Sequence, residues 1–151
     1  MMAKDAKDLI ARLHTAAQVL EIFLEEHLER SSPNAPTITQ LLFLARLYRL
    51  DKSNLPIKDI RRHCYGSSNI AYLIEKLQKR GLLTRTENKE NKRETNLVLT
   101  AKGKEFASKA SAVLDLIEDD LGKYFPAAVA AEINRWVEQH NTTPRTDRSV
   151  A

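Results

Sequence analysis

Residues 83–103, LTRTENKENKRETNLVLTAKG, constrain the fold of this 151-residue chain more than any other segment. A strand-like run at 83–86 leads into a tip rich in Lys, Arg, Glu and Asn, and an alternating run follows at 95–100. β-Branched Thr and Val in such runs favour a pleated, half-buried surface. The Thr-Ala-Lys-Gly that follows is typical of a helix start. The segment therefore predicts a hairpin with a basic tip that leads directly into a helix.

The segment before this hairpin has the pattern of an amphipathic helix. Residues 67–80 place Ile70, Leu73, Ile74 and Leu77 at helical spacing, and Gly81 is a typical helix stop. Helix, glycine, strand, basic tip and strand is the element order of a winged helix. We therefore expect a mainly α protein with a small β wing.

The remaining apolar stripes predict further helices. We expect them at about 5–30, from Thr37 or Thr39 to about 50, at 57–64, at 101–121 and from Pro126 to about 140. The stretch 51–56, DKSNLP, is expected to be a connection, and the polar tail 141–151 to be disordered. This gives one domain over 5–140, with a winged-helix part at about 37–103 and flanking helices at about 5–30 and 104–140.

The flanking helices carry more apolar surface than one small winged helix can cover. We therefore expect them to be dimerisation helices that pack against a second copy of the chain, which also suits recognition of two DNA half-sites. The alternative is that they close a monomeric helical bundle.

The basic charge is concentrated in the winged-helix segment. Residues 58–104 carry 12 Lys and Arg against 5 Asp and Glu, although the whole chain has a net charge of only +4. A basic segment of this kind is the electrostatic pattern of nucleic-acid binding. Binding of duplex DNA is therefore the expected function. The alternative is a non-catalytic adaptor whose basic face binds acidic protein partners.

Other classes of function find little support. The single cysteine, Cys64, excludes an internal disulfide, fits a reducing cytoplasm and is expected in the core rather than as a redox sensor. The chain shows no signal-peptide core and no apolar run of the roughly 18 residues that a membrane span needs. These features lead us to expect a cytoplasmic protein. Neither metal-ligand spacing nor a phosphate loop nor a nucleophile motif is found, so we expect no metal, no cofactor and no enzymatic activity.

Candidate DNA-binding residues follow from their places in the winged helix. A helix in the major groove reads bases near its N-terminal end, and an arginine on a narrow hairpin suits the negative potential of the minor groove. Helix capping and solvated charge are the alternative roles for several of these residues. The expected set is Ser67, Ser68, Asn69, Tyr72, Lys76 and Lys79 on the reading helix, Arg61 and Arg62 before it, and Lys89, Lys92 and Arg93 on the wing.

Over about residues 5–140 the chain resembles the MarR family of winged-helix transcriptional regulators. The resemblance is carried by the segments SSNIAYLIEKLQKRGLLTR and NKRETNLVLTAKG and by the order of the flanking helices. It implies a homodimer that binds a pseudo-palindromic operator and regulates transcription. It also implies release by a small-molecule effector in a cleft beside the dimerisation helices, although no residue here identifies a ligand, an operator, or repression over activation.

The chain departs from the family pattern in two places, the wing motif and the reading helix. The acidic residue of the wing motif is replaced by Asn91, so the charge pair that steadies the wing arginine is absent. Ala71 and Tyr72 stand where relatives often place Ser and Arg. Base preference is therefore not transferable from a relative, and a mobile wing tip is expected.

Overall fold

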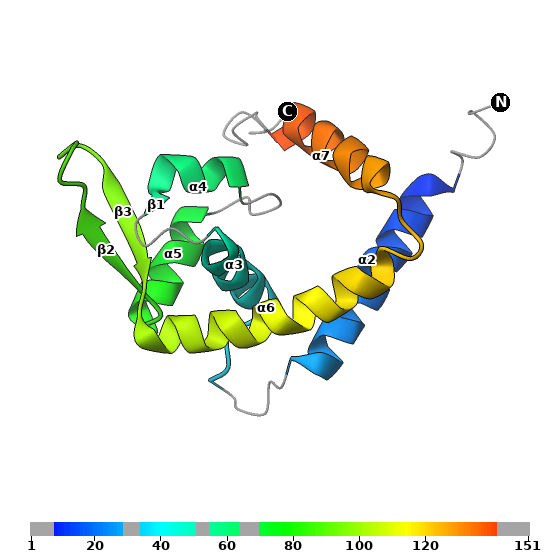
Figure 1. The fold of residues 1–151 in the computed structure, drawn as a ribbon, viewed down its shortest axis with the longest axis horizontal. Coiled ribbons are helices and arrows are strands. Elements are labelled where there is room, and N and C mark those ends of the chain that lie inside the picture. Colours follow the sequence, from blue (N-terminus) through cyan, green and yellow to red (C-terminus); the bar gives the residue numbers. More distant parts are fainter. Residues whose placement is uncertain (1–7, 29–33, 51–54, 64–69, 142–151) are drawn as a thin grey trace, which may run out of the picture.

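A computed structural model describes residues 8–28, 34–50, 55–63 and 70–141 (Figure 1). The described part is mainly helical, with one small sheet, as the sequence predicts. In chain order the elements are α2 (Leu9–His27), α3 (Ile38–Arg49), β1 (Leu55–Pro56), α4 (Ile57–His63), α5 (Ile70–Lys79), β2 (Leu83–Glu87), β3 (Thr95–Leu99), α6 (Ala101–Leu121) and α7 (Ala127–Asn141).

Helix α3 forms the centre of the protein, and six of its twelve residues are buried. Thr37 caps it in a reciprocal arrangement. The backbone amide of Gln40 donates to the Thr37 hydroxyl over 3.2 Å, and the backbone amide of Thr37 donates to the side-chain oxygen of Gln40 over 3.1 Å. Leu44 and Ala45, near the middle of the helix, are completely buried.

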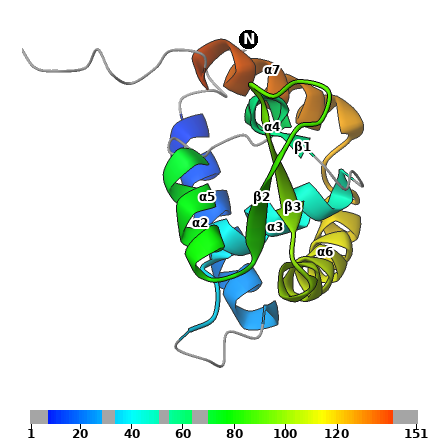
Figure 2. The same cartoon turned by 90° about the vertical axis from the view of Figure 1, so that its left-hand side faces the viewer.

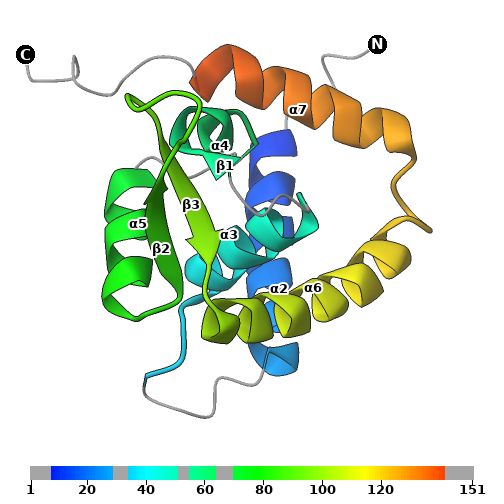
Figure 3. The same cartoon turned by 60° about the vertical axis from the view of Figure 1, so that its left-hand side comes forward.

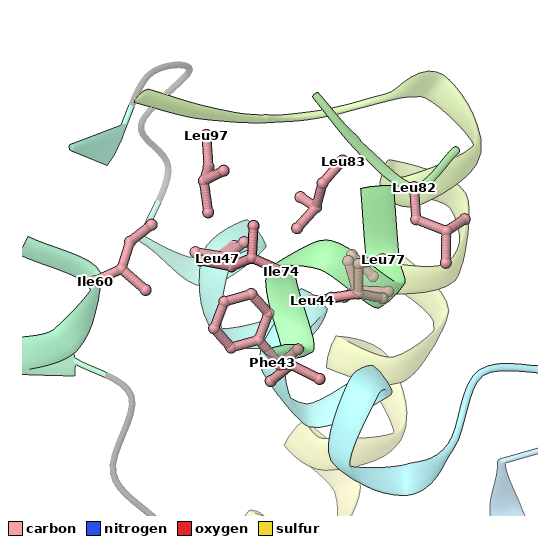
Figure 4. Packing of buried hydrophobic residues seen from close by; sticks show 11 residues of the cluster. Phe43, Leu44, Leu47, Ile60, Ile74, Leu77, Leu82, Leu83 and Leu97 are labelled. Atoms are coloured by element: carbon pink, nitrogen blue, oxygen red, sulfur yellow. The ribbon is translucent and has the colours of Figure 1, made fainter. Parts of the chain in front are cut away.

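One hydrophobic cluster, here called the wing core, joins α3 to α4, α5, the sheet and α6 (Figure 4). The four apolar residues predicted to face inward from α5 all pack in or against it. Ile60, on α4, is fully buried. The buried members are Phe43, Leu44, Leu47, Ile60, Leu73, Ile74, Leu77, Leu82, Leu83, Leu97 and Ala107.

A second cluster, the junction cluster, lies where α2, α3 and α6 meet. Its buried members are Leu24, Leu28, Leu41, Ala45, Ala110 and Ile117, and Phe106 packs against both clusters. Arg49, at the end of α3, strengthens this junction through polar contacts with α6. Its guanidinium donates to the Ser111 hydroxyl over 3.1 Å and forms ion pairs of 2.6 Å with Asp115 and 2.9 Å with Glu118. These carboxylates raise the pKa of Arg49 above its ordinary value, with the hydrogen bond to Glu118 as the largest cause.

The sheet has three strands in the order β1-β3-β2, and both pairs are antiparallel. The expectation that 51–56 is only a connection was therefore wrong for residues 55 and 56, which form β1. Leu55 pairs with Leu97, and Pro56 pairs with Asn96. A two-residue edge strand is too short to show a period, and proline is compatible with such an edge. This strand ties the start of α4 to the base of the wing.

The turn from α5 into the hairpin and the start of α6 meet at one joint. Gly81 adopts φ +70°, and the Leu82 amide donates to the Leu77 carbonyl, which closes α5 as predicted. The Thr100 hydroxyl donates to the Gly81 carbonyl over 2.6 Å and accepts from the Gly103 amide over 3.0 Å. One side chain thus caps α6 and holds it to the end of α5.

The two ends of the described chain are far less covered than the centre. Figure 1 shows α6 running from the sheet toward α2 and α7. Of the stripe predicted on α2, only Leu24 and Leu28 are buried, and none of residues 127–140 of α7 is buried. Exposed apolar residues on these two helices are Leu9, Ile10, Leu13, Val19, Leu20, Ile22, Phe23, Ile133 and Trp136. None of the described helices is long and apolar enough to cross a membrane.

Candidate nucleic-acid interface

Helix α5 presents a polar outer face, because its apolar stripe is turned into the wing core. Tyr72 is 55% exposed, and Lys76 lies one turn further along with its Nζ 5.2 Å from the centre of the Tyr72 ring. A cation over an aromatic ring is an electrostatically favourable arrangement. The pair places an aromatic hydroxyl and a positive charge together on the outward side of α5.

Lys79, on the next turn of α5, is paired with a neighbour. Its Nζ lies 2.7 Å from the Glu75 carboxylate, and both side chains are exposed. The hydrogen bond between them, reinforced by their charges, lowers the pKa of Glu75 and raises the pKa of Lys79. A phosphate contact from Lys79 would therefore have to compete with Glu75.

The wing projects away from the core. Strand β2 pairs with β3 from Leu83 opposite Leu99 to Glu87 opposite Thr95, yet only Leu83 of β2 is buried. Residues 86–96, the outer half of the hairpin, include no apolar residue, so no hydrophobic side chain of its own holds its shape. Lys89, Lys92 and Arg93 at its tip are all exposed.

Two asparagines organise the tip through hydrogen bonds to backbone amides. The Asn88 side-chain oxygen accepts from the amides of Glu90 (3.0 Å) and Asn91 (3.4 Å). The Asn91 side-chain oxygen accepts from the Arg93 amide over 3.2 Å. These are Asx turns, in which a short side chain replaces a backbone acceptor. Asn91 therefore contacts the backbone at Arg93 without a carboxylate, and the mobility of the tip stays a prediction.

Helix α5 and the wing lie side by side. In Figure 2 α5 and the β2–β3 hairpin face the viewer together, and Figure 3 shows α5 next to β2. The structure thus places α5, the helix that carries Tyr72, Lys76 and Lys79, next to the wing.

Several expected site residues lie outside the described part of the chain. These are Ser67, Ser68 and Asn69, together with Cys64; the tail beyond residue 141 is outside it as well. The backbone of Arg61 and Arg62 belongs to α4, but their side chains are not described.

The structure adds two cations that the sequence reasoning did not select. Arg85 is exposed on β2, close enough to α5 for its charge to contribute to the lowered pKa of Glu75. Lys58, on the first turn of α4, forms an ion pair with Glu94 of the wing. Each had a signal only in the charge count, because neither the pairing of α5 with β2 nor that of α4 with the wing follows from spacing.

Within residues 8–28, 34–50, 55–63 and 70–141, no cluster of three or more His, Cys, Asp and Glu side chains is placed to hold a metal ion.

Comparison with known proteins identifies the fold. Residues 43–103 match the family model described as a winged helix DNA-binding domain. No curated protein sequence matches the chain. Solved structures do match it, although with 17–20% sequence identity for the three described next.

Staphylococcus aureus MepR in its DNA-binding conformation has a TM-score of 0.66 and 17% identity, covering 87% of this chain and 94% of its own. A mutant of MarR from Escherichia coli, complexed with operator DNA, has a TM-score of 0.62 and 18% identity, covering 89% and 94%. PcaV from Streptomyces coelicolor, in complex with its natural ligand, has a TM-score of 0.63 and 20% identity, covering 93% and 96%.

These matches and the geometry above agree: residues 43–103 are similar to a winged helix DNA-binding domain. Over its described length the chain has the fold of the MarR-type transcriptional regulators, which confirms the resemblance seen in the sequence.

Proposed function

We propose that this protein is a transcriptional regulator that binds a pseudo-palindromic operator in duplex DNA as a homodimer. The observation that carries the proposal is the position of α5. Its polar outer face lies beside a projecting hairpin that bears three exposed cations. A helix and an adjacent wing of this kind suit contact with the major and minor grooves of the same duplex.

We assign the contacts by chemistry. The Tyr72 hydroxyl suits a phosphate or a base edge, and its ring suits a thymine methyl group; Lys76 and Lys79 suit phosphates. Arg93 suits the minor groove, where a narrow, A·T-rich groove has enhanced negative potential. The expected roles of Ser67, Ser68, Asn69, Arg61, Arg62, Lys89 and Lys92 belong to the same proposal.

The homodimer is supported by the exposed apolar residues of α2 and α7. Helices that expose Ile10, Ile22 and Trp136 at 84%, 59% and 62% leave a large apolar surface in water, and such a surface usually marks an interaction site. Packing against a second copy would cover it. Two recognition helices would then lie about one DNA turn, roughly 34 Å, apart.

A small molecule that relieves DNA binding is the second part of the proposal. PcaV was solved with its natural ligand, and this chain shares its fold. The proposed role is binding and regulation, without catalysis, and it is consistent with the cytoplasmic location expected from the sequence.

DNA binding is tested by selecting bound sequences from a random duplex pool and measuring affinity for the selected site as a function of salt. We expect an inverted-repeat site, with log affinity falling by about 0.9 per phosphate neutralised for each unit of log salt. Tight binding to an acidic protein, combined with a salt slope near zero on DNA, would instead support the adaptor alternative.

A further inference from the structure

We propose that Lys58, Glu94 and Asn88 form a clasp that holds the wing against α4 and so positions Arg93 for DNA. The proposal rests on the proposed DNA-binding function and assigns three residues a positioning role within it. Glu94 lies directly after Arg93, so it places a negative charge on a surface whose other features suit a polyanion. A carboxylate is unexpected there.

Glu94 is the more enclosed partner of this ion pair. Its side chain is only 20% exposed, whereas that of Lys58 is 64% exposed. One carboxylate oxygen pairs with the Lys58 ammonium, and the other accepts from the Asn88 side-chain amide over 3.3 Å. Both oxygens are therefore engaged, one by α4 and one by the opposite side of the hairpin.

The same residues also close the hairpin through the backbone. The backbone amide of Asn88 donates to the backbone carbonyl of Glu94 over 3.2 Å. The backbone amide of Glu94 donates to the backbone carbonyl of Asn91 over 2.9 Å. Asn88 then uses its side-chain oxygen to order the tip. The clasp thus connects three elements, since α4, the start of the tip and the end of the tip all meet at Glu94.

The clasp lies next to the proposed DNA-contacting arginine. Lys58, Arg93 and Glu94 line one shallow recess between the start of α4 and the wing, together with Pro56, Ile57 and Thr95. Residues 86–96, which form the outer hairpin, include no apolar side chain, and Asn96 is the one buried residue among them. Polar contacts must therefore fix its direction, and fixing it before binding reduces the conformational entropy lost on DNA.

The direction in which one substitution changes the DNA affinity tests the clasp. Glu94→Gln removes a negative charge near the proposed path of the phosphates, so charge alone predicts tighter DNA binding. The clasp predicts the opposite, because Gln carries no charge to pair with the Lys58 ammonium and has one acceptor oxygen where Glu94 uses two. We expect Glu94→Gln to weaken binding to the selected operator by threefold to tenfold, with little change in the salt slope.

The matched control is Glu90→Gln, which removes the same charge from an exposed position on the same tip. It should bind as well as the wild type or slightly more tightly. Lys58→Arg should retain near wild-type affinity, because it preserves the pair. Lys58→Met should cost less in the Glu94→Gln background than in the wild type, since the pair is already broken there.

Amide hydrogen exchange without DNA provides a second measurement. The amides of Asn88, Arg93 and Glu94 should exchange faster in Glu94→Gln, while those of α3 and α6 stay unchanged. Wild-type binding with equal or tighter binding by Glu94→Gln would overturn the clasp and leave the proposed function intact. If the wild type binds no duplex in a salt-dependent way, the proposed function fails, and the role of the clasp in DNA binding fails with it.

Discussion

The carbonyl oxygen of Leu82 lies 2.0 Å from the position that a Cβ atom on Gly103 would occupy. The first turn of α6 therefore packs directly on the backbone that links α5 to the wing. This contact gives a physical reason for the glycine that ends the segment NKRETNLVLTAKG, and it allows Thr100 to reach both Gly81 and Gly103.

Gly103→Ala should destabilise the protein, because a backbone carbonyl cannot move aside as a flexible side chain can. We expect a loss of roughly 1–3 kcal/mol in the free energy of unfolding, the range for overpacked sites. Chemical denaturation measures it. The control is Gly122→Ala at the end of α6, where φ is −61° and the nearest atom is 3.3 Å away. Equal losses in the two variants would contradict the close packing at Leu82.

Arg49→Met should weaken the junction between α3 and α6. The substitution keeps much of the aliphatic side chain but removes two ion pairs and the hydrogen bond to Ser111. Because both carboxylates are largely exposed, we expect a modest loss of about 1 kcal/mol in unfolding free energy. Lys109→Met, which breaks an exposed pair with Glu105 on α6, should have almost no effect. Thermal unfolding of both variants would separate the two cases.

Lys79→Met should raise the pKa of Glu75 toward its ordinary value. The hydrogen bond to Lys79 is the main cause of the lowered pKa, so its removal leaves only weaker charge effects. A carboxyl with a lowered folded-state pKa stabilises the fold above its unfolded-state pKa and loses that contribution as pH falls through the folded-state value. NMR titration of the Glu75 carboxyl carbon in both proteins measures the shift. An unchanged titration curve would exclude Lys79 as its cause.

Arg93→Ala should weaken DNA binding by roughly 1–3 kcal/mol, most strongly on sites with A·T-rich flanks. The fold and the oligomeric state should survive, because Arg93 is exposed at a hairpin tip. Lys76→Ala should instead weaken binding about equally on all sequences and reduce the salt slope by about one unit. Anisotropy titrations on matched duplexes distinguish the two. Unchanged affinity in Arg93→Ala would remove the wing from the mechanism.

Light scattering at micromolar concentration should give about twice the chain mass of 17.2 kDa. Ile133→Asp should shift the mass toward the monomer, because it places a charge on the exposed apolar part of α7. Thr84→Asp adds the same charge to exposed β2 and should leave the mass unchanged. A wild-type protein that remains monomeric would contradict both the dimer and the two-half-site model.

The sequence predicted those features that depend on local periodicity. The bounds of α6 agree with the predicted 101–121, and Thr37, Gly81 and Thr100 act at the ends of the helices expected there. Such signals depend only on residues close together in the chain, so a single sequence is enough to recognise them.

Contacts between distant segments were not predictable in this way. The pairing of Leu55 with Leu97 has no period to reveal it, and Lys58 meets Glu94 across 36 positions. The buried Asn96 was also unexpected, because an alternating strand should expose it. Such features follow from how the elements pack together, and local patterns carry little information about packing.

The partnership of α3 and α6 also has a consequence for the order in which the chain can fold during synthesis. Arg49 and Ser111 are separated by 62 positions, and α6 is the helix that packs most extensively on α3. A chain made from its N-terminus therefore produces α3, half of whose residues are buried in the folded protein, long before the partner that covers it. Until α6 leaves the ribosome, the face of α3 that it will bury stays open to water, to chaperones and to other nascent chains.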